Sequence, residues 1–345
     1  MTALSRLRLK WPILQAPMAG AQDETLALAV TAAGGLGGLP AGMLALEALD
    51  QALAAVEGQG PVNVNFFSHV SPEPQPSRLE KWRALLAPYH EELGIAPPPP
   101  SDTPTRRPFD SDACAIVERH RPAVVSFHFG LPEAQLVERV KACGALVLST
   151  ATTVDEARWL EAHGADVVIA QGLEAGGHRG HFLSDDLSLQ LPLASLLPRV
   201  VEAISLPVVA TGGIGDPQGV RQALDLGAQA VQIGTALLCC PEASVRAVHR
   251  RALLDDEAST DITNVFSGRP ARGIVNRAMR ELGPLSDEVP DFPLAASALC
   301  ELRAAHESRC SGDFSPLWAG QNRRHCREVP VAEQLQWLAG ELEEQ

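Results

Sequence analysis

Residues 163–182 read HGADVVIAQGLEAGGHRGHF, and this stretch joins a strand to a glycine-rich loop that contains two histidines. The apolar run 165–170 predicts a buried strand, and Gly164 before it fits the end of a preceding helix. The glycines that follow let the backbone turn sharply and approach a flat or anionic ligand closely. An imidazole inside such a loop, at the end of a strand, suits a general base. The question for the rest of the chain is therefore whether it builds a scaffold that places a ligand in front of His178.

The junction of a helix-ending glycine with a new strand recurs along the chain, at Cys143-Gly144-Ala145 and Leu226-Gly227-Ala228. Short apolar runs alternate with amphipathic segments, which is typical of βα units and a parallel sheet. The predicted strands are residues 13–18, 36–39, 62–66, 124–129, 146–149, 167–170, 208–210 and 230–233. The predicted helices between them include residues 24–33, 44–56, 132–142, 154–162, 193–204 and 217–226. Eight βα units in about 240 residues match a (β/α)8 TIM barrel, with a doubly wound sheet as the structural alternative.

Two regions depart from this rhythm. Within the predicted barrel of residues 1–240, residues 68–112 are rich in proline, which cannot continue a helix or a central strand. We interpret them as an insertion after strand three with one helix near residues 78–92, either a surface decoration or a wall over the barrel mouth. After Leu238 the strand pattern stops, and residues 243–257, 294–308 and 331–343 predict helices. Residues 241–345 are therefore predicted to form a helical appendage or lid.

Charge and composition argue against several classes of protein. The chain of 345 residues has a net charge of −14, whereas a nucleic-acid partner requires a basic surface. A small anionic ligand remains compatible with this charge, because local fields can oppose it. No segment approaches the roughly 20 apolar residues that span a bilayer, and no signal peptide is indicated. Seven scattered cysteines without a Cys-x-x-Cys pair predict a reduced, cytoplasmic protein. The oligomeric state stays open, a homo-oligomer included.

Small and polar residues recur where the predicted strands end, which is where a barrel carries its function. Thr211-Gly212-Gly213 follows the seventh predicted strand, and Gly234-Thr235 follows the eighth. Glycine-rich loops at these two places form the usual phosphate site of a barrel through backbone N–H groups, and a plain turn is the alternative. A Rossmann fingerprint is not supported, because its third glycine falls one residue late, at Gly219, and Gln232 replaces the expected acidic residue.

The histidines allow more than one interpretation. His178 and His181 are spaced like a metal pair, but the Glu of a metalloprotease helix is missing and the surrounding glycines break helices. We therefore predict no metal site. His128 follows the apolar run 124–127 and precedes a Gly-Leu-Pro turn, which favours a functional role over the structural one that a lone histidine often has.

Six motifs come in order along the chain and carry a family resemblance. They are QAPMAG at 15–20, NVN at 63–65, FHFG at 127–130, QGLEAGGHRG at 171–180, ATGGI at 210–214 and QIGT at 232–235. Together they resemble the nitronate monooxygenases, formerly called 2-nitropropane dioxygenases, over roughly residues 11–240, with a further match at LWAGQ, 317–321. The EAGGHRG segment is specific, whereas the PMAG and TGGI segments are shared with other FMN barrels.

The resemblance implies non-covalent FMN on a TIM barrel and the oxidation of alkyl nitronates or nitroalkanes with O2 to a carbonyl compound and nitrite. It implies that residues 311–325 return to the flavin site. His178 would be the catalytic base, and His128 would help to bind the nitro or nitronate group. The implied cofactor-binding residues are Met18 and Asn65 at the isoalloxazine, Gln171, Gly176 and Gly177 along the flavin, and Gly213, Gln232, Ile233, Gly234 and Thr235 at the phosphate.

The chemistry of the residues agrees with this assignment. Removing a proton α to a nitro group needs a base with a pKa near neutrality, which imidazole supplies, and the protonated imidazole then stabilises the anionic nitronate. Two alternatives remain open. One is an FMN-dependent NAD(P)H reductase of enoyl thioesters or quinones, which shares the Glu-Ala-Gly-Gly-His stretch; the other is a flavin-free phosphosugar barrel enzyme such as an isomerase. Better-studied relatives carry tyrosines around the substrate, whereas this chain has only Tyr89, so the substrate stays open.

Overall fold

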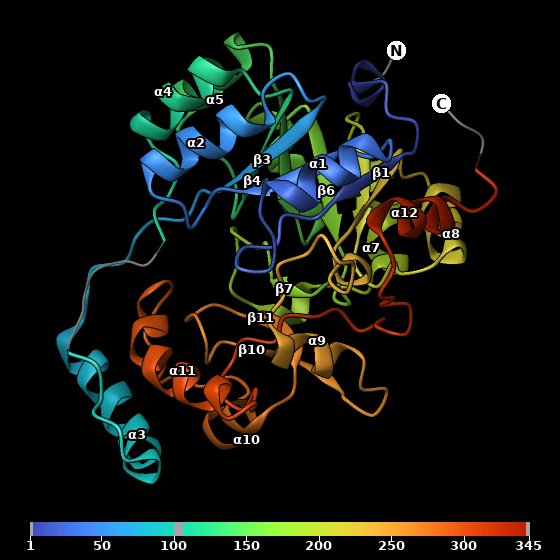
Figure 1. The fold of residues 1–345 in the computed structure, drawn as a ribbon. Helices are drawn as coiled ribbons and strands as arrows, with labels where there is room; N and C mark the ends of the chain where they lie inside the picture. The colour runs from blue at the N-terminus through green and yellow to red at the C-terminus, as the bar shows by residue number, and fades with distance from the viewer. Residues whose placement is uncertain (1–2, 100–105, 343–345) are drawn as a thin grey trace.

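Eight parallel strands form one sheet that curls into a barrel with helices outside it (Figure 1). The computed structural model describes residues 3–99 and 106–342. The barrel strands are β1 (Ile13–Gln15), β2 (Gly37–Pro40), β3 (Val62–Phe67), β4 (Val124–His128), β5 (Leu146–Ala151), β6 (Val167–Gln171), β8 (Val208–Thr211) and β9 (Ala230–Ile233). Neighbours follow the order β1-β9-β8-β6-β5-β4-β3-β2, and a parallel bridge between Leu14 and Leu36 brings β1 beside the start of β2. The predicted (β/α)8 barrel and its eight strands are confirmed, and the doubly wound alternative is not.

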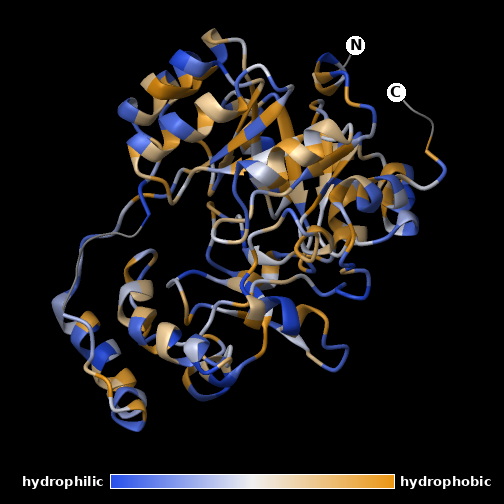
Figure 2. Cartoon of the chain, viewed as in Figure 1, coloured by the Kyte–Doolittle hydropathy of each residue, from blue (hydrophilic) through white to orange (hydrophobic). Residues whose placement is uncertain are grey.

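Alternation along the strands explains how the barrel fills. In β6, Val167 and Ile169 pack with Leu148 and Val209 inside the barrel, whereas Val168 and Ala170 pack against the surrounding helices. Successive side chains of a strand point to opposite faces, so a strand buried on both faces is a continuous apolar run. Figure 2 shows the apolar residues gathered on these strands and on the helix faces that cover them.

The helices that surround the barrel are α1 (Glu24–Ala32), α2 (Leu46–Val56), α4 (Ser111–His120), α5 (Ala134–Ala142), α6 (Val154–Ala162), α7 (Leu193–Ala203), α8 (Pro217–Asp225) and α12 (Val331–Ala339). The last of these lies far from β9 in sequence, yet it packs between α8 and α1. Its residues Val331, Leu335 and Leu338 belong to the same hydrophobic cluster as the barrel strands. The C-terminal helix therefore completes the ring instead of forming part of a lid.

The remainder of the chain after β9 is an appendage beneath the barrel mouth, as Figure 1 shows. It contains α9 (Ala247–Leu253), α10 (Arg277–Leu282), the 3₁₀-helix Leu294–Leu299, α11 (Cys300–Ser308) and two strands, β10 (Thr260–Thr263) and β11 (Ala271–Ile274). Our prediction that no strand follows Leu238 was wrong. These strands are short and partly polar. They pair with each other, and β11 also pairs with β7 (Gly177–His178), in the loop after β6.

The proline-rich insertion contributes a helix to the appendage and not to the barrel. Helix α3 (Pro76–Leu93) covers the predicted helical piece, and Figure 1 shows it beside α11. Trp82 and Leu86 on α3 are buried in a cluster with Phe314 and Leu302 of the C-terminal region. The indole N–H of Trp82 donates to the carbonyl of Ala295 at 3.3 Å. The insertion and the appendage therefore share one hydrophobic core.

Candidate active site

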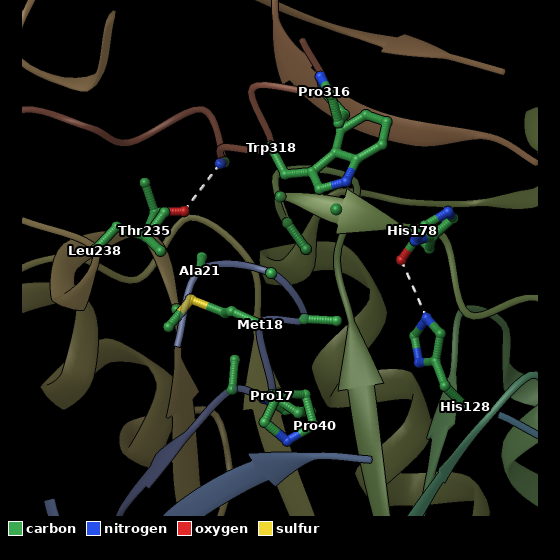
Figure 3. Close-up of a pocket in the computed structure, with 18 of the residues that line it drawn as sticks. Pro17, Met18, Ala21, Pro40, His128, His178, Thr235, Leu238, Pro316 and Trp318 are labelled. Carbon is green, nitrogen blue, oxygen red and sulfur yellow. Dashed lines mark hydrogen bonds between the residues drawn. The ribbon is translucent and has the colours of Figure 1, made fainter. Parts of the chain in front are cut away.

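A pocket opens between the carboxyl ends of the barrel strands and the appendage. Figure 3 shows Pro17 and Met18 on the barrel side of this pocket and Pro316 and Trp318 on the appendage side. His178 lies toward one end of the pocket and Thr235 toward the other. The pocket is therefore a slot whose two faces come from parts of the chain that are distant in sequence.

One end of the slot, here called the glycine end, is formed by Gly213, Gly234 and Thr235. Within the described chain, the backbone N–H groups of these three residues have no protein acceptor. Gly213 has a φ of +71°, and a Cβ on Gly234 would lie 3.2 Å from the Cβ of Ala16, so larger residues would crowd this end. Free backbone N–H groups in glycine loops after two neighbouring strands form a cradle for a phosphate.

The C-terminal region braces the glycine end. The side-chain amide of Asn322 donates to the carbonyl of Gly213 at 3.1 Å, and the N–H of Gly320 donates to the hydroxyl oxygen of Thr235 at 3.0 Å. A Cβ on Gly176 would lie 2.5 Å from backbone atoms of Ala319 and Gly320. Glycine is required there because two backbone segments meet without room for a side chain.

Two amide side chains, those of Asn65 and Gln232, also line the slot. Asn65 donates to the hydroxyl of Ser126 at 2.9 Å, and Gln232 keeps a buried carbonyl oxygen without a partner in the described chain. A buried unpaired oxygen is costly unless a ligand or water completes it. The pocket therefore holds a hydrogen-bond acceptor, the side-chain oxygen of Gln232, that no protein group in the described chain uses.

The histidine end is lined by His128 and His178, with Ser267 in contact with His178 behind them, and the backbone of His178 is held from two sides. Its carbonyl accepts hydrogen bonds from Nε2 of His128 at 3.1 Å and from Nε2 of Gln171 at 3.0 Å. Gln171 also accepts the N–H of Gly180 at 2.8 Å, and β7 pairs His178 with Ala271 of the appendage. The loop that carries His178 is therefore shared between the barrel and the appendage sheet.

Both ring nitrogens of His128 have protein partners. Because a carbonyl oxygen only accepts, Nε2 of His128 carries the proton, and Nδ1 accepts from the hydroxyl of Thr150 at 3.1 Å. Burial lowers the pKa of His128 to about 3, so the ring is neutral at pH 7. Binding a nitro group with either ring nitrogen would require one of these two bonds to break.

The side chain of His178 lies in a positively charged, apolar environment. Its ring centroid lies 5.4 Å from that of Phe292 and 5.5 Å from that of Trp318, and Nε2 lies 2.9 Å from Oγ of Ser267. Burial, with the Arg106 charge adding to it, holds the pKa of His178 well below its usual value. A neutral imidazole at pH 7 can accept a proton.

Arg269 supplies a second buried positive charge near this end. Its guanidinium stacks on Phe129 at 4.1 Å from the ring centroid and bonds to the carbonyl of His181. Burial lowers its pKa to about 10, and it takes part in none of the ion pairs found in the described part of the chain. A buried cation without a carboxylate partner favours an anion in the pocket.

Comparison with known proteins places the chain in a family. The sequence profile of the nitronate monooxygenase family matches residues 1–340. The chain belongs to the nitronate monooxygenase family. A nitronate monooxygenase from Pseudomonas aeruginosa is 41% identical, with 97% of each chain covered. The crystal structure of nitroalkane oxidase from Streptomyces ansochromogenes is 38% identical with a TM-score of 0.88, covering 99% of this chain and 98% of the other. FabK from Thermotoga maritima is 26% identical with a TM-score of 0.71, covering 98% and 94%.

This family member is therefore an oxidoreductase, and the resemblance identified from the six motifs is confirmed. Nitronate monooxygenases are flavin-dependent enzymes. No described helix is both long and apolar enough to cross a membrane.

The pocket of this nitronate monooxygenase family member is lined by all but one of the site residues that we predicted from its sequence. Those that line it are Met18, Asn65, His128, Gln171, Gly176, Gly177, His178, Gly213, Gln232, Gly234 and Thr235. Ile233 does not line it, because its side chain is buried in the core between the strands and the helices. Leu317, Trp318 and Gly320 also line the pocket, within the segment 311–325.

Sequence reasoning missed Ser267, Arg269 and Thr150 at the histidine end. Ser267 and Arg269 stand in a Ser-Gly-Arg-Pro run between β10 and β11, where glycine and proline indicate a turn. That signal predicts a loop but does not say which site the loop reaches. Their contacts with His178 and His181 span about 90 residues of sequence and arise only from folding.

Proposed function

We propose that this chain is an FMN-dependent nitronate monooxygenase that oxidises alkyl nitronates and nitroalkanes with O2 to a carbonyl compound and nitrite. The observation that carries the proposal is the arrangement of the slot: a neutral, half-buried histidine at one end faces a cradle of free backbone N–H groups at the other. FMN is a flat ring with a phosphate tail, so this combination suits it.

The residues present fit FMN at both parts of the molecule. The proposed phosphate ligands are Gly213, Gly234 and Thr235, whose N–H groups lack acceptors in the described chain. Gln232 also lines the slot, and its unpaired buried oxygen can accept a hydrogen bond from a donor group of the cofactor but cannot bind the phosphate; Ile233 could contribute through its backbone only. The proposed isoalloxazine contacts, all of which line the slot, are Met18, Asn65, Gln171, Gly176 and Gly177.

The protein residues have distinct tasks in the proposed reaction. His178 accepts the proton from the carbon next to the nitro group, because its lowered pKa keeps it neutral at pH 7. The buried charges of Arg106 and Arg269 favour the nitronate anion that results. Phe67, Phe129 and Phe292 pack together beside His178 and limit water there. Bound FMN supplies the electron transfer between substrate and O2.

His128 takes a role different from the one that the resemblance implied. Because its two ring nitrogens hold the carbonyl of His178 and the hydroxyl of Thr150, we propose that it orients His178. Gln171 shares this task through its bond to the same carbonyl.

A spectrum followed by anaerobic mixing tests the function. The purified protein should carry the yellow absorption of FMN, or take FMN up, and a preformed nitronate should reduce it without O2. Readmitted O2 should then yield nitrite. A protein that neither carries nor binds FMN would leave the flavin-free isomerase as the surviving hypothesis.

The competing function is an FMN-dependent NAD(P)H reductase of enoyl thioesters or quinones. The likeness to FabK, at 26% identity, keeps this candidate in view. NADH and NADPH are therefore mixed anaerobically with the holoenzyme in parallel with the nitronate. Bleaching of the flavin by NAD(P)H but not by nitronate would refute the monooxygenase proposal and support the reductase.

A further inference from the structure

Ser267 makes a contact with His178 that neither the family motifs nor the proposed reaction assigns. Its hydroxyl oxygen lies 2.9 Å from Nε2 of His178, and it comes from the turn between β10 and β11, 89 residues away in sequence. The inference drawn from this contact rests on the proposed function, in which His178 is the base. Which of its two ring nitrogens takes the proton depends on what Ser267 does.

The position of Ser267 is fixed by the turn around it. Its side chain is 1% exposed, and the N–H groups of Ser267 and Gly268 both donate to the carbonyl of Asn264, at 3.3 and 2.8 Å. Gly268 has a φ of +87°, and a Cβ there would lie 2.2 Å from the carbonyl oxygen of Pro290. Only glycine fits this position, and the turn therefore has little freedom to withdraw Ser267 from His178.

The hydroxyl of Ser267 has a second partner besides His178. Its hydroxyl also lies 3.2 Å from the carbonyl oxygen of Arg269, which can only accept. With the hydroxyl proton directed to the carbonyl of Arg269, the oxygen accepts a hydrogen bond from Nε2 of His178. A neutral imidazole with its proton on Nε2 has an unprotonated Nδ1.

Nδ1 of His178 is available for chemistry. Nδ1 has no hydrogen-bond partner in the described chain. It is also not one of the fully buried atoms, and His178 lines the pocket, so Nδ1 can be reached from the pocket. The accessible nitrogen is therefore Nδ1, while Nε2 is engaged on the appendage side.

We propose that Ser267 is a positioning residue that holds His178 in the Nε2–H tautomer, so that Nδ1 is the nitrogen that accepts the α-proton of the substrate. In this step the substrate C–H bond breaks and an Nδ1–H bond forms. The electron pair of the C–H bond moves onto the nitro group, giving the nitronate anion and an imidazolium. Nε2–H donates to Ser267 before and after the transfer, so the ring need not turn.

The tautomer can be measured without any substrate. In wild-type protein labelled with ¹⁵N-histidine, two-bond ¹H–¹⁵N correlation spectra at pH 7 distinguish protonated from unprotonated ring nitrogens. The His178 signals are those that disappear in His178→Asn. We expect the proton on Nε2 in the wild type and a mixture of both tautomers in Ser267→Ala. A proton on Nδ1 in the wild type would overturn the proposal.

Kinetics give a second readout. In Ser267→Ala, kcat/KM for a neutral nitroalkane should fall roughly 10-fold, as expected for one lost hydrogen bond to the base, whereas turnover of the preformed nitronate should be unchanged. The acid limb of the kcat/KM profile should also move to lower pH, because the imidazolium loses its acceptor. Ser267→Thr, which keeps the hydroxyl, should restore both properties.

The control is Ser297→Ala, which removes an appendage hydroxyl that bonds only locally, to the carbonyl of Leu294. Equal losses on nitroalkane and nitronate in Ser267→Ala would indicate a merely structural role and refute the proposal. Failure of the proposed function looks different: no nitroalkane or nitronate would be turned over by the wild type, while the tautomer spectra would still decide the role of Ser267.

Discussion

At the glycine end of the slot the available polar groups are backbone N–H groups of Gly213, Gly234 and Thr235, whereas at the histidine end they are side chains held by other side chains. The glycine end is built from local turns after two strands, which Asn322 and Gly320 of the C-terminal region brace. The histidine end needs β11 to pair with β7 and the Ser267 turn to reach His178. Cofactor binding and proton transfer should therefore fail separately when the two ends are altered, and four predictions test this separation.

The largest effect is expected for His178→Asn. If His178 takes the proton, kcat/KM for a neutral nitroalkane should fall about 10²–10⁴-fold while the preformed nitronate is still oxidised and FMN is retained. Steady-state nitrite release on both substrates measures this. His163→Asn, at an exposed position on the barrel, is the control. Loss of FMN together with activity would contradict the proposed independence of the two ends.

Arg179→Met should destabilise the loop that carries His178. The Arg179 side chain is fully buried and donates to the carbonyls of Gln171 and Gly172 and to the side chain of Gln190. Three buried acceptors left unpaired should cost about 3 kcal/mol of unfolding free energy. Urea denaturation measures this.

The matched control for that substitution is the exposed Arg199→Met, because Arg199 has no such bonds. Equal stability of the two variants would show that the three acceptors find other partners. Arg179 would then contribute less to the free energy of unfolding than its contacts indicate.

Gly213→Ala tests the glycine end. Gly213 has a left-handed φ of +71°, and a Cβ would lie 2.9 Å from the Cβ of Glu174, so the loop must shift. A left-handed alanine costs about 1–2 kcal/mol, and we expect FMN affinity to fall about 10-fold as the N–H group turns away. Fluorescence titration with FMN measures this, with Gly219→Ala on α8 as the control. Proton abstraction at saturating FMN should be unchanged; a specific loss of that step would couple the two ends.

The last prediction concerns the pH dependence of stability. Burial lowers the pKa of His128 and His181 to about 3 and that of His69 to about 4. The unfolded chain binds protons at these histidines below about pH 6.5, whereas the folded chain does not, so stability is lost as the pH falls from 6.5 toward 3. Each histidine contributes at most about 1.4 kcal/mol per pH unit. The urea midpoint should fall between pH 7 and pH 5, with a shallower slope in His181→Gln; a flat profile would contradict burial of these rings.

Sequence reasoning predicted the barrel well because its signals are local. Most of the eight strands are short apolar runs, and helix-ending glycines such as Gly144, Gly164 and Gly227 adopt positive φ. Strands β10 and β11 were missed because four residues each, partly polar, carry no clear period. Helix α3 was predicted, but its packing against the C-terminal region depends on contacts such as that of Trp82 with Ala295, which no local pattern contains.

By itself, the sequence determined the barrel, the glycine loops at its mouth and the histidine in the loop after β6, because strand periodicity and glycine conformation are properties of neighbouring residues. Only the tertiary structure decided that α12 closes the ring, that both nitrogens of His128 are occupied and that Ser267 reaches His178. The physical reason is that a hydrogen bond or a hydrophobic contact depends on distance in space, and residues 178 and 267 come together only when the appendage sheet forms across the barrel mouth.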